Sequence, residues 1–158
     1  MPTPQIVWQC PLRGAVRVTQ HFGDNDVSGY APMPGHNGID YSDVEGRVVR
    51  APCAGEVAVG NPAGAYSAYG VHLWIKGSHE GKTFWAILAY LRRALADDHE
   101  MVEPGNIVAL SGNTGRSTAP HLHVGIETTT PNPGYQDAYD PDYYWHAPTA
   151  TNGRVRLA

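Results

Sequence analysis

The order of apolar and polar residues along the chain predicts many short β-strands. Residues 14–20 alternate between the two kinds, which is the two-residue period of a strand with one buried face. Residues 48–59 and 101–110 each predict two β-rich stretches folded about a turn that contains proline and glycine. Residues 24–35 and 61–70 are rich in glycine, proline and small polar residues, and we expect both to be loops.

A second alternating segment, residues 70–76, divides its side chains between two faces. Its apolar side chains share one face: Val71, Leu73 and Ile75. We expect this face to enter the core, because successive side chains of a strand point to opposite sides of the sheet. His72, Trp74 and Lys76 then lie on the other face, and His72 is predicted to point to solvent.

Residues 83–91 contain a nearly continuous apolar run, which periodicity alone does not assign. A strand that pairs back on residues 70–76 is one interpretation. A helix over residues 86–95, with the large aliphatic side chains on one side, is the other.

Length and composition agree with a single β-rich domain. The chain has 158 residues, 42% of them hydrophobic, which is enough to bury one core. Its 18 glycines and 13 prolines are many for a helical protein and suit short strands joined by tight turns. The net charge of -4 and the isoelectric point near 6.0 argue against a nucleic-acid partner, which would require a basic face.

The sequence predicts neither a secretory leader nor a membrane span. Residues 1–14 lack a charged segment followed by an apolar run, and no apolar stretch approaches the roughly 18 residues that cross a bilayer. We therefore expect a soluble protein, which something else must deliver if it acts on a cell wall. Cys10 and Cys53 could form one disulfide, but without an export signal we favour two separate, half-buried thiols.

The candidate chemistry centres on two histidines at the start of a predicted strand, His121 and His123. Side chains two residues apart share a face, and a rise of about 3.3 Å per residue puts their backbones roughly 7 Å apart. Both imidazoles can then converge on one centre while Leu122 and Val124 point into a core. This arrangement suits a metal site, although paired histidines on an exposed strand are also common. Spacing alone does not tell a ligand from a base within this pair.

A second group of candidate ligands lies upstream, where His36 and Asp40 are four residues apart. Zinc accepts imidazole nitrogen and carboxylate oxygen, and a catalytic zinc typically has three protein ligands. Gly35 and Gly38 disfavour a helix at this place. We therefore expect His36 on a turn and Asp40 on the strand that follows.

Residues 35–42 and 111–127, which contain these histidines and the aspartate, resemble the lysostaphin-type (LytM-like) zinc metallopeptidases, which cut peptide cross-links of bacterial peptidoglycan. The resemblance covers about residues 15–128. It implies an all-β fold with a mainly antiparallel sheet, a core like that of barrel-sandwich hybrids, long groove-forming loops and little helix. Residues 129–158 would be an extension packed on the same domain, so that residues 1–158 form a single unit.

The resemblance also implies the roles of the candidate residues. His36, Asp40 and His123 would bind one zinc ion, and His121 would handle the proton of the attacking water. The chain departs from the family at Tyr90, which stands where these enzymes usually have a second catalytic histidine. A tyrosine hydroxyl is protonated at neutral pH, so we expect Tyr90 to stabilise the oxyanion of the transition state rather than to act as a base.

For the rest of the chain, the resemblance favours a strand that ends near Tyr90 and a short helical turn over residues 92–98. The aromatic residues within 129–158 either pin this segment to the domain or stack on a sugar. His99 and His146 have no site context and are expected at the surface, while His21 is expected at the surface or behind a ligand.

The sequence therefore predicts a monomeric zinc endopeptidase that acts on peptidoglycan peptides and binds no nucleic acid. One alternative is a catalytically impaired domain that binds or regulates at the cell wall. Another is a structural domain of a larger assembly such as a phage tail. Retention of all three candidate ligands favours the enzyme, because relatives that only bind are expected to lack them.

Overall fold

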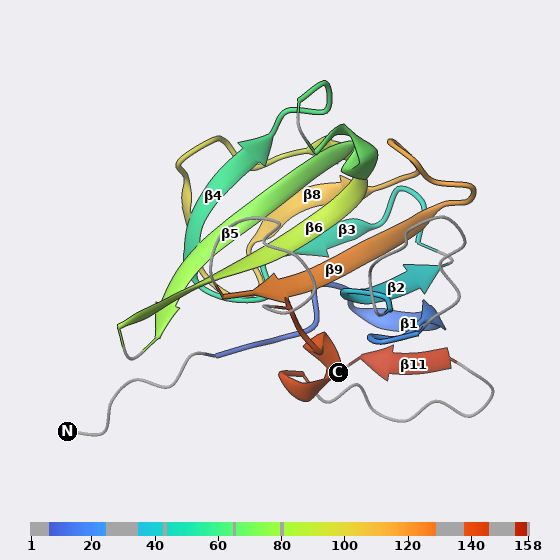
Figure 1. The fold of residues 1–158 in the computed structure, drawn as a ribbon, viewed down its shortest axis with the longest axis horizontal. Coiled ribbons are helices and arrows are strands. Elements are labelled where there is room, and N and C mark those ends of the chain that lie inside the picture. Colours follow the sequence, from blue (N-terminus) through green and yellow to red (C-terminus); the bar gives the residue numbers. More distant parts are fainter. Residues whose placement is uncertain are drawn as a thin grey trace.

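Antiparallel strand pairing dominates the computed structural model of the chain (Figure 1). The structure describes residues 7–24, 35–42, 44–64, 66–79, 81–128, 138–145 and 154–157. The strands in these ranges belong to one sheet: β1 (Gly14–Gln20), β2 (Ile39–Ser42), β3 (Val48–Arg50), β4 (Gly55–Gly60), β5 (Val71–His79), β6 (Lys82–Ala94), β7 (Met101–Val102), β8 (Ile107–Ser111), β9 (His121–Glu127), β10 (Ala138–Tyr139) and β11 (Arg154–Leu157). Two short 3₁₀ helices accompany them: η1 (Ser67–Tyr69) and η3 (Pro141–Tyr143). The predicted all-β fold with little helix is confirmed.

The sheet is organised around β6, which pairs with three other strands. The main strand order is β11-β1-β2-β9-β6-β5-β4-β7. One edge of β6 pairs with β5; along the other edge, residues 85–89 pair with β9 and residues 91–94 pair with β8. The sheet therefore forks at Tyr90, between the two sets of partners.

Apolar side chains gather on both faces of the central strands. The main core includes fully buried residues of β2, β5, β6 and β9: Ile39, Tyr41, Leu73, Ile75, Leu88, Leu122 and Val124. The inward positions predicted for Leu122 and Val124 are confirmed. A second cluster lies on the opposite face of β5 and β6: Trp74, Ile87 and Ala89, with Ala58, Tyr69, Trp85 and Tyr90 packed against them.

His72 is buried, so the prediction that it points to solvent is wrong. Its ring meets those of Tyr66, Tyr69 and Trp74 at centroid distances of 6.5, 5.9 and 6.2 Å. Its Nδ1–H donates to the carbonyl oxygen of Gly70 at 2.7 Å, and burial lowers the pKa of this imidazole. The alternation in residues 70–76 did not predict exposure correctly, because both faces of β5 are covered here. Of the three residues predicted to point outward, only Lys76 is exposed.

β6 is a continuous strand from Lys82 to Ala94. Pairing with β8 keeps residues 91–94 extended, and the backbone N–H groups of Leu95 and Ala96 both donate to Val108 O. The alternative helix over residues 86–95 and the helical turn expected over residues 92–98 are therefore both wrong.

Cys10 and Cys53 are free thiols. Cys10 is partly buried, as expected. Cys53 is fully buried, whereas a half-buried thiol was expected. Burial raises the pKa of Cys10 to about 11 and the pKa of Cys53 to about 12. Residues 25–34 of the expected loop and His146 lie outside the described residues.

No helix within the described ranges is long and apolar enough to cross a bilayer.

Trp145 attaches residues 138–145 to the core. Its indole Nε1–H donates to the hydroxyl of Tyr41 at 3.0 Å, and the side chain is almost fully buried. The ring of Tyr144 lies 5.0 Å from that of Trp8, which also contacts Trp145. Tyr143, in contrast, is 80% exposed. The contacts of Trp145 and Tyr144 are those expected of aromatic side chains that pin a segment to a domain.

We predict that Trp145→Ala lowers the free energy of unfolding by about 3–5 kcal/mol, because it leaves a cavity in the core and removes the donor to Tyr41. Urea denaturation measures this change. Tyr143→Ala, in the same segment, is the control and should stay within about 0.5 kcal/mol of the parent protein. Equal losses in the two variants would contradict the anchoring role of Trp145.

Candidate metal centre

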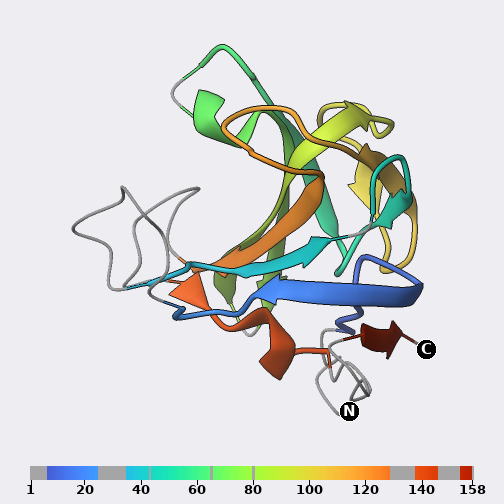
Figure 2. The same cartoon turned by 90° about the vertical axis from the view of Figure 1, so that its right-hand side faces the viewer.

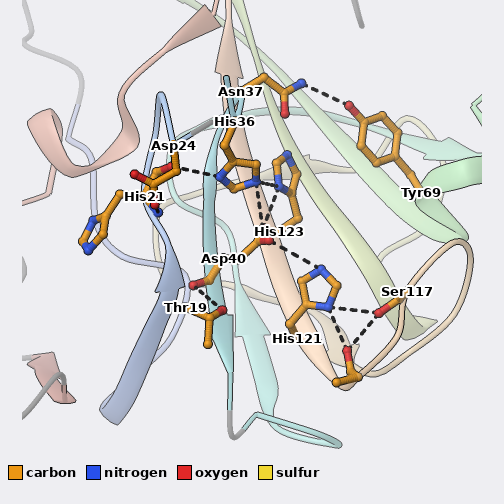
Figure 3. A network of polar contacts seen from close by, with 11 residues as sticks. Thr19, His21, Asp24, His36, Asn37, Asp40, Tyr69, Ser117, His121 and His123 are labelled. Atoms are coloured by element: carbon orange, nitrogen blue, oxygen red, sulfur yellow. Dashed lines mark hydrogen bonds and ion pairs between the residues drawn. The ribbon is translucent and has the colours of Figure 1, made fainter. Parts of the chain in front are cut away.

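Three residues predicted as metal ligands come together where β2 lies beside β9. The antiparallel register pairs Asp40 with His123, and directly opposed residues of two strands point to the same face. His36 precedes β2, and its side chain points to the same place (Figure 3). Asp40 lies on a strand as predicted, whereas His36, predicted on a turn, lies in an irregular segment with bends on either side of it.

The three side chains meet through one atom each. His123 Nδ1 lies 2.9 Å from Asp40 Oδ1 and 3.1 Å from His36 Nε2. His36 Nε2 lies 3.2 Å from the same carboxylate oxygen, and the three atoms all lie within 4.8 Å of one another. Two imidazole nitrogens and one carboxylate oxygen are donors that zinc accepts. The residues present therefore fit a metal ion.

The surroundings of Asp40 and His123 favour the protonation states in which these two side chains bind a metal. Burial alone would raise the pKa of Asp40, but its contacts with His123 and His36 outweigh this effect and hold the pKa well below its ordinary value. Burial lowers the pKa of His123, although the neighbouring carboxylate opposes the shift. An ionised carboxylate and a neutral imidazole are the forms that bind metals.

A short turn fixes the orientation of His36. The Nδ1–H of His36 donates to the carbonyl oxygen of His21 at 3.1 Å, which leaves Nε2 directed at the other two residues. The backbone bonds from Gly23 N to His36 O and from His36 N to Asp24 O are both 2.8 Å long. Such a bond to the far nitrogen is the usual means of orienting a metal-binding histidine. The side chain of His21 is 62% exposed, while its backbone carbonyl lies behind the candidate ligand His36. His21 is therefore both at the surface and behind a ligand, the two positions predicted for it.

Two glycines lie beside the ring of His123, and Gly38 leaves room for it. A Cβ atom at Gly38 would lie 2.2 Å from Val124 O and 2.7 Å from His123 Cε1. A Cβ atom at Gly125 would lie 2.8 Å from Ile87 Cγ2 and 3.6 Å from His123 Nε2. Any side chain at Gly38 would therefore separate β2 from β9 or displace the ring.

His121 lies beside the cluster and directs one nitrogen toward it (Figure 3). Its Nδ1 is 2.9 Å from Ala119 O and 3.0 Å from Ser117 Oγ. Because a carbonyl oxygen can only accept, Nδ1 carries a proton, and Nε2 is left as the acceptor of the neutral ring. This Nε2 faces Asp40 Oδ2 at 3.8 Å. A proton acceptor thus stands next to the three candidate ligands.

Tyr90 lies at the fork of β6 with its ring against His121. The ring centroids of these two residues are 4.3 Å apart, and the centroid of His123 is 6.2 Å from that of Tyr90. The φ of Tyr90 is +60°, a left-handed conformation that few residues other than glycine adopt. The pairing of β6 with β5 shifts register between Leu88 and Leu91, and such a bulge redirects a side chain. The backbone irregularity therefore brings Tyr90 to the site.

Sequence reasoning assigned no role to three other residues of this region: Asn37, Tyr69 and Ser117. Asn37 Nδ2 donates to the hydroxyl of Tyr69 at 3.3 Å, and Ser117 contacts His121. Asn37 and Ser117 lie near the histidines in sequence, which could have marked them. Tyr69 belongs to a loop far from them in sequence, so no local pattern points to it.

Comparison with known proteins finds one family model on this region. The model of peptidase family M23 matches residues 34–141, which include both histidine segments and Tyr90. An uncharacterised metalloprotease of Haemophilus influenzae is 35% identical over 117 residues, which are 72% of this chain and 23% of that protein. The DD-carboxypeptidase/endopeptidase Mpg of Neisseria meningitidis serogroup B is 34% identical over 88 residues, which are 56% of this chain and 19% of that protein. The chain thus spans about a quarter or less of these relatives.

A solved structure extends the comparison to the fold. The catalytic domain of the prophage-encoded M23 protein EnpA from Enterococcus faecalis, crystallised as a mutant, is 28% identical to this chain. The TM-score is 0.66, and the match covers 85% of this chain and 96% of that chain. Similarity of this extent shows that the two chains share a fold.

We predict that Gly38→Ala destabilises the protein by about 1–3 kcal/mol and weakens metal binding at least tenfold, because the new methyl group would overlap Val124 O and the His123 ring. Urea denaturation and a zinc titration measure the two effects. Gly64→Ala is the control, since the nearest atom to its new Cβ would be Asn61 O at 3.3 Å. Unchanged zinc affinity in Gly38→Ala would show that the ring tolerates displacement.

Proposed function

Because the chain belongs to peptidase family M23, we propose that it is a zinc-dependent endopeptidase that hydrolyses peptide cross-links of bacterial peptidoglycan. The observation that carries the proposal is the convergence of His36, Asp40 and His123 with His121 at their side. A relative described as a DD-carboxypeptidase/endopeptidase and another described as a metalloprotease support the reaction class. The proposed substrate is a peptide stem or cross-bridge of the wall.

His36, Asp40 and His123 would hold the zinc ion through Nε2, Oδ1 and Nδ1. When bound there, zinc would supply a Lewis acid that polarises a carbonyl group and lowers the pKa of water toward neutrality. The ordered register of β2 and β9 presents Asp40 and His123 together, and the His21 carbonyl keeps His36 turned toward them. The protein therefore supplies a donor set that is oriented before any ion binds.

His121 is the proposed proton carrier of the reaction. Its Nδ1–H is held by Ala119 O, so Nε2 can take a proton from water and then pass it to the leaving amine. Nε2 faces the Asp40 carboxylate, which stabilises the imidazolium while it carries that proton. Ser117 and Ala119 thereby keep the ring in the tautomer that this role needs.

Tyr90 is proposed to stabilise the charge that develops on the substrate oxygen. It packs against His121, at the place where the resemblance to the family implies a second histidine. Its hydroxyl can donate a hydrogen bond to an oxyanion, and one such donor typically contributes about 10²–10³-fold to the rate. His121 would then be the single residue that exchanges a proton with the reactants.

We predict one zinc ion per chain, bound through His36, Asp40 and His123. Alanine at any one of the three should abolish stoichiometric zinc, because a catalytic site needs three protein ligands.

His121→Ala should keep the metal but lose about 10²–10⁴-fold in turnover of a cross-link peptide, the usual contribution of a positioned base. Elemental analysis of the purified variants, together with hydrolysis assays, tests both statements.

The variants also test each other. Full zinc occupancy in His36→Ala would contradict the ligand assignment. Loss of zinc in His121→Ala would make His121 a ligand and remove its role as base. A wild-type protein without stoichiometric zinc would overturn the proposed function.

We predict that Tyr90→Phe lowers kcat/KM on a cross-link peptide by at least about tenfold while zinc is retained, because it removes only the hydroxyl donor. Tyr90→His on the same substrate is the informative comparison. If the wild type is inactive on several wall types and Tyr90→His is active, the natural site is disabled by this one residue. That result would favour the alternative of an impaired wall-binding domain.

A further inference from the structure

The orientation of the His123 ring requires an explanation beyond the ligand cluster. Its Nδ1 is committed to His36 and Asp40, and Nε2 is buried without a hydrogen-bond partner among the described residues. Metal-binding histidines usually donate their other N–H to an acceptor, and this bond fixes the rotation of the ring. Packing must therefore fix the rotation of the His123 ring, because no such hydrogen bond within the described part of the chain does so.

Packing holds this ring on two sides. Gly38 comes so close that a Cβ atom there would lie 2.7 Å from His123 Cε1. Tyr69 stacks on the imidazole, with a centroid distance of 5.8 Å and an interplanar angle of 21°. A stacked partner opposes rotation about the Cβ–Cγ bond, because rotation of the imidazole would break the favourable stacked contact.

The hydroxyl of Tyr69 contacts Asn37, the residue next to the candidate ligand His36. Asn37 Nδ2 donates to this hydroxyl at 3.3 Å, and Asn37 directly follows His36 (Figure 3). One side chain from a separate loop thus contacts the segments that carry two of the three candidate ligands. The ring of Tyr69 also meets that of Tyr90 at 6.2 Å, so it packs on both sides of the site.

Tyr69 is itself held by two loops that touch through their backbones, before β5 and before β9 (Figure 2). Gly70 and Gly115 both have positive φ, and a Cβ atom on either would lie within 2.4 Å of the other's nitrogen. Arg116 N donates to Ala68 O at 2.8 Å, and Val71 N donates to Thr114 Oγ1 at 3.0 Å. The phenol ring therefore rests on a fixed backbone.

From these contacts we propose that Tyr69 is a positioning residue for the metal centre, which orients His123 by ring stacking and His36 through Asn37. The proposal rests on the proposed metal-binding function, and it adds a residue that acts through the ligands without being one. Residues that orient metal ligands typically change metal affinity by about 10- to 100-fold when they are removed.

The test is a zinc competition titration with a chromophoric chelator. Tyr69→Ala should weaken zinc binding by about 10- to 100-fold, because the ring loses its stacking partner. Tyr69→Phe keeps the stacked ring and loses only the bond to Asn37, so its loss should be about fivefold, the worth of one ordinary hydrogen bond. Asn37→Ala should match Tyr69→Phe, and the double variant should be no weaker than either, because both changes remove the same bond.

Tyr66→Ala is the matched control. It removes an aromatic ring from the same loop, but one that packs on Trp74 and His72 of β5. Its zinc affinity should stay within about threefold of the wild type, as expected for a change that spares the ligands and their contacts. An equal loss in Tyr66→Ala and Tyr69→Ala would show that the loop as a whole matters, and would overturn the specific role of Tyr69.

A second measurement on the metal-free protein separates this inference from the proposed function. A stacked tyrosine shifts the ring protons of His123 upfield in the NMR spectrum, and this shift should persist in Tyr69→Phe and vanish in Tyr69→Ala. If the wild type binds no zinc but the shift behaves in this way, the enzyme proposal fails and the positioning contact stands. Unchanged histidine resonances in Tyr69→Ala, or unchanged zinc affinity, would overturn the role of Tyr69.

Discussion

The antiparallel register of β2 and β9 is the constraint on which the candidate site depends. It places Asp40 opposite His123, and a shift of one residue would turn every side chain of a strand to the other face. The core opposes that shift, because the opposite faces of these strands carry fully buried residues: Ile39, Tyr41, Leu122 and Val124. Burial of each large apolar side chain stabilises the fold by about 1.5–3 kcal/mol. Apolar packing therefore determines where the ligands stand, without any contribution from the ligands themselves.

The surroundings of the ligands come instead from irregularities in the sheet. β6 changes partner at Tyr90, and the bulge at that position brings a tyrosine ring against His121. Gly70 and Gly115 let two loops touch, and this contact places Tyr69 on the ring of His123. Side chains at bulges and loops can change with little effect on strand pairing. The chemistry around the centre is thus separable from the geometry of the ligands.

The sequence was most informative where one face of a strand is buried and the other carries the site. The positions of Leu122 and Val124 in the core, and of His121 and His123 on the shared face, follow from a period of two. The same rule failed for His72, because a strand covered on both faces can alternate without exposing either. Tyr69 could not be found at all, since its contacts arise from the meeting of loops that are distant in sequence. The sequence therefore indicated the candidate ligands and His121, but it did not indicate the residues that pack around them.

The cost of the ligand cluster itself bears on function. Two imidazoles and a carboxylate are nearly buried with their donor atoms about 3 Å apart, and polar groups in such surroundings destabilise a fold unless their interactions compensate. Replacing a buried polar cluster by apolar residues of similar volume is often neutral or stabilising. Folding alone therefore gives no reason to keep His36, Asp40 and His123 together, whereas a bound metal ion does. Tyr90, by contrast, lies at a bulge and outside this donor set, so the identity of its side chain leaves the case for a metal ion intact.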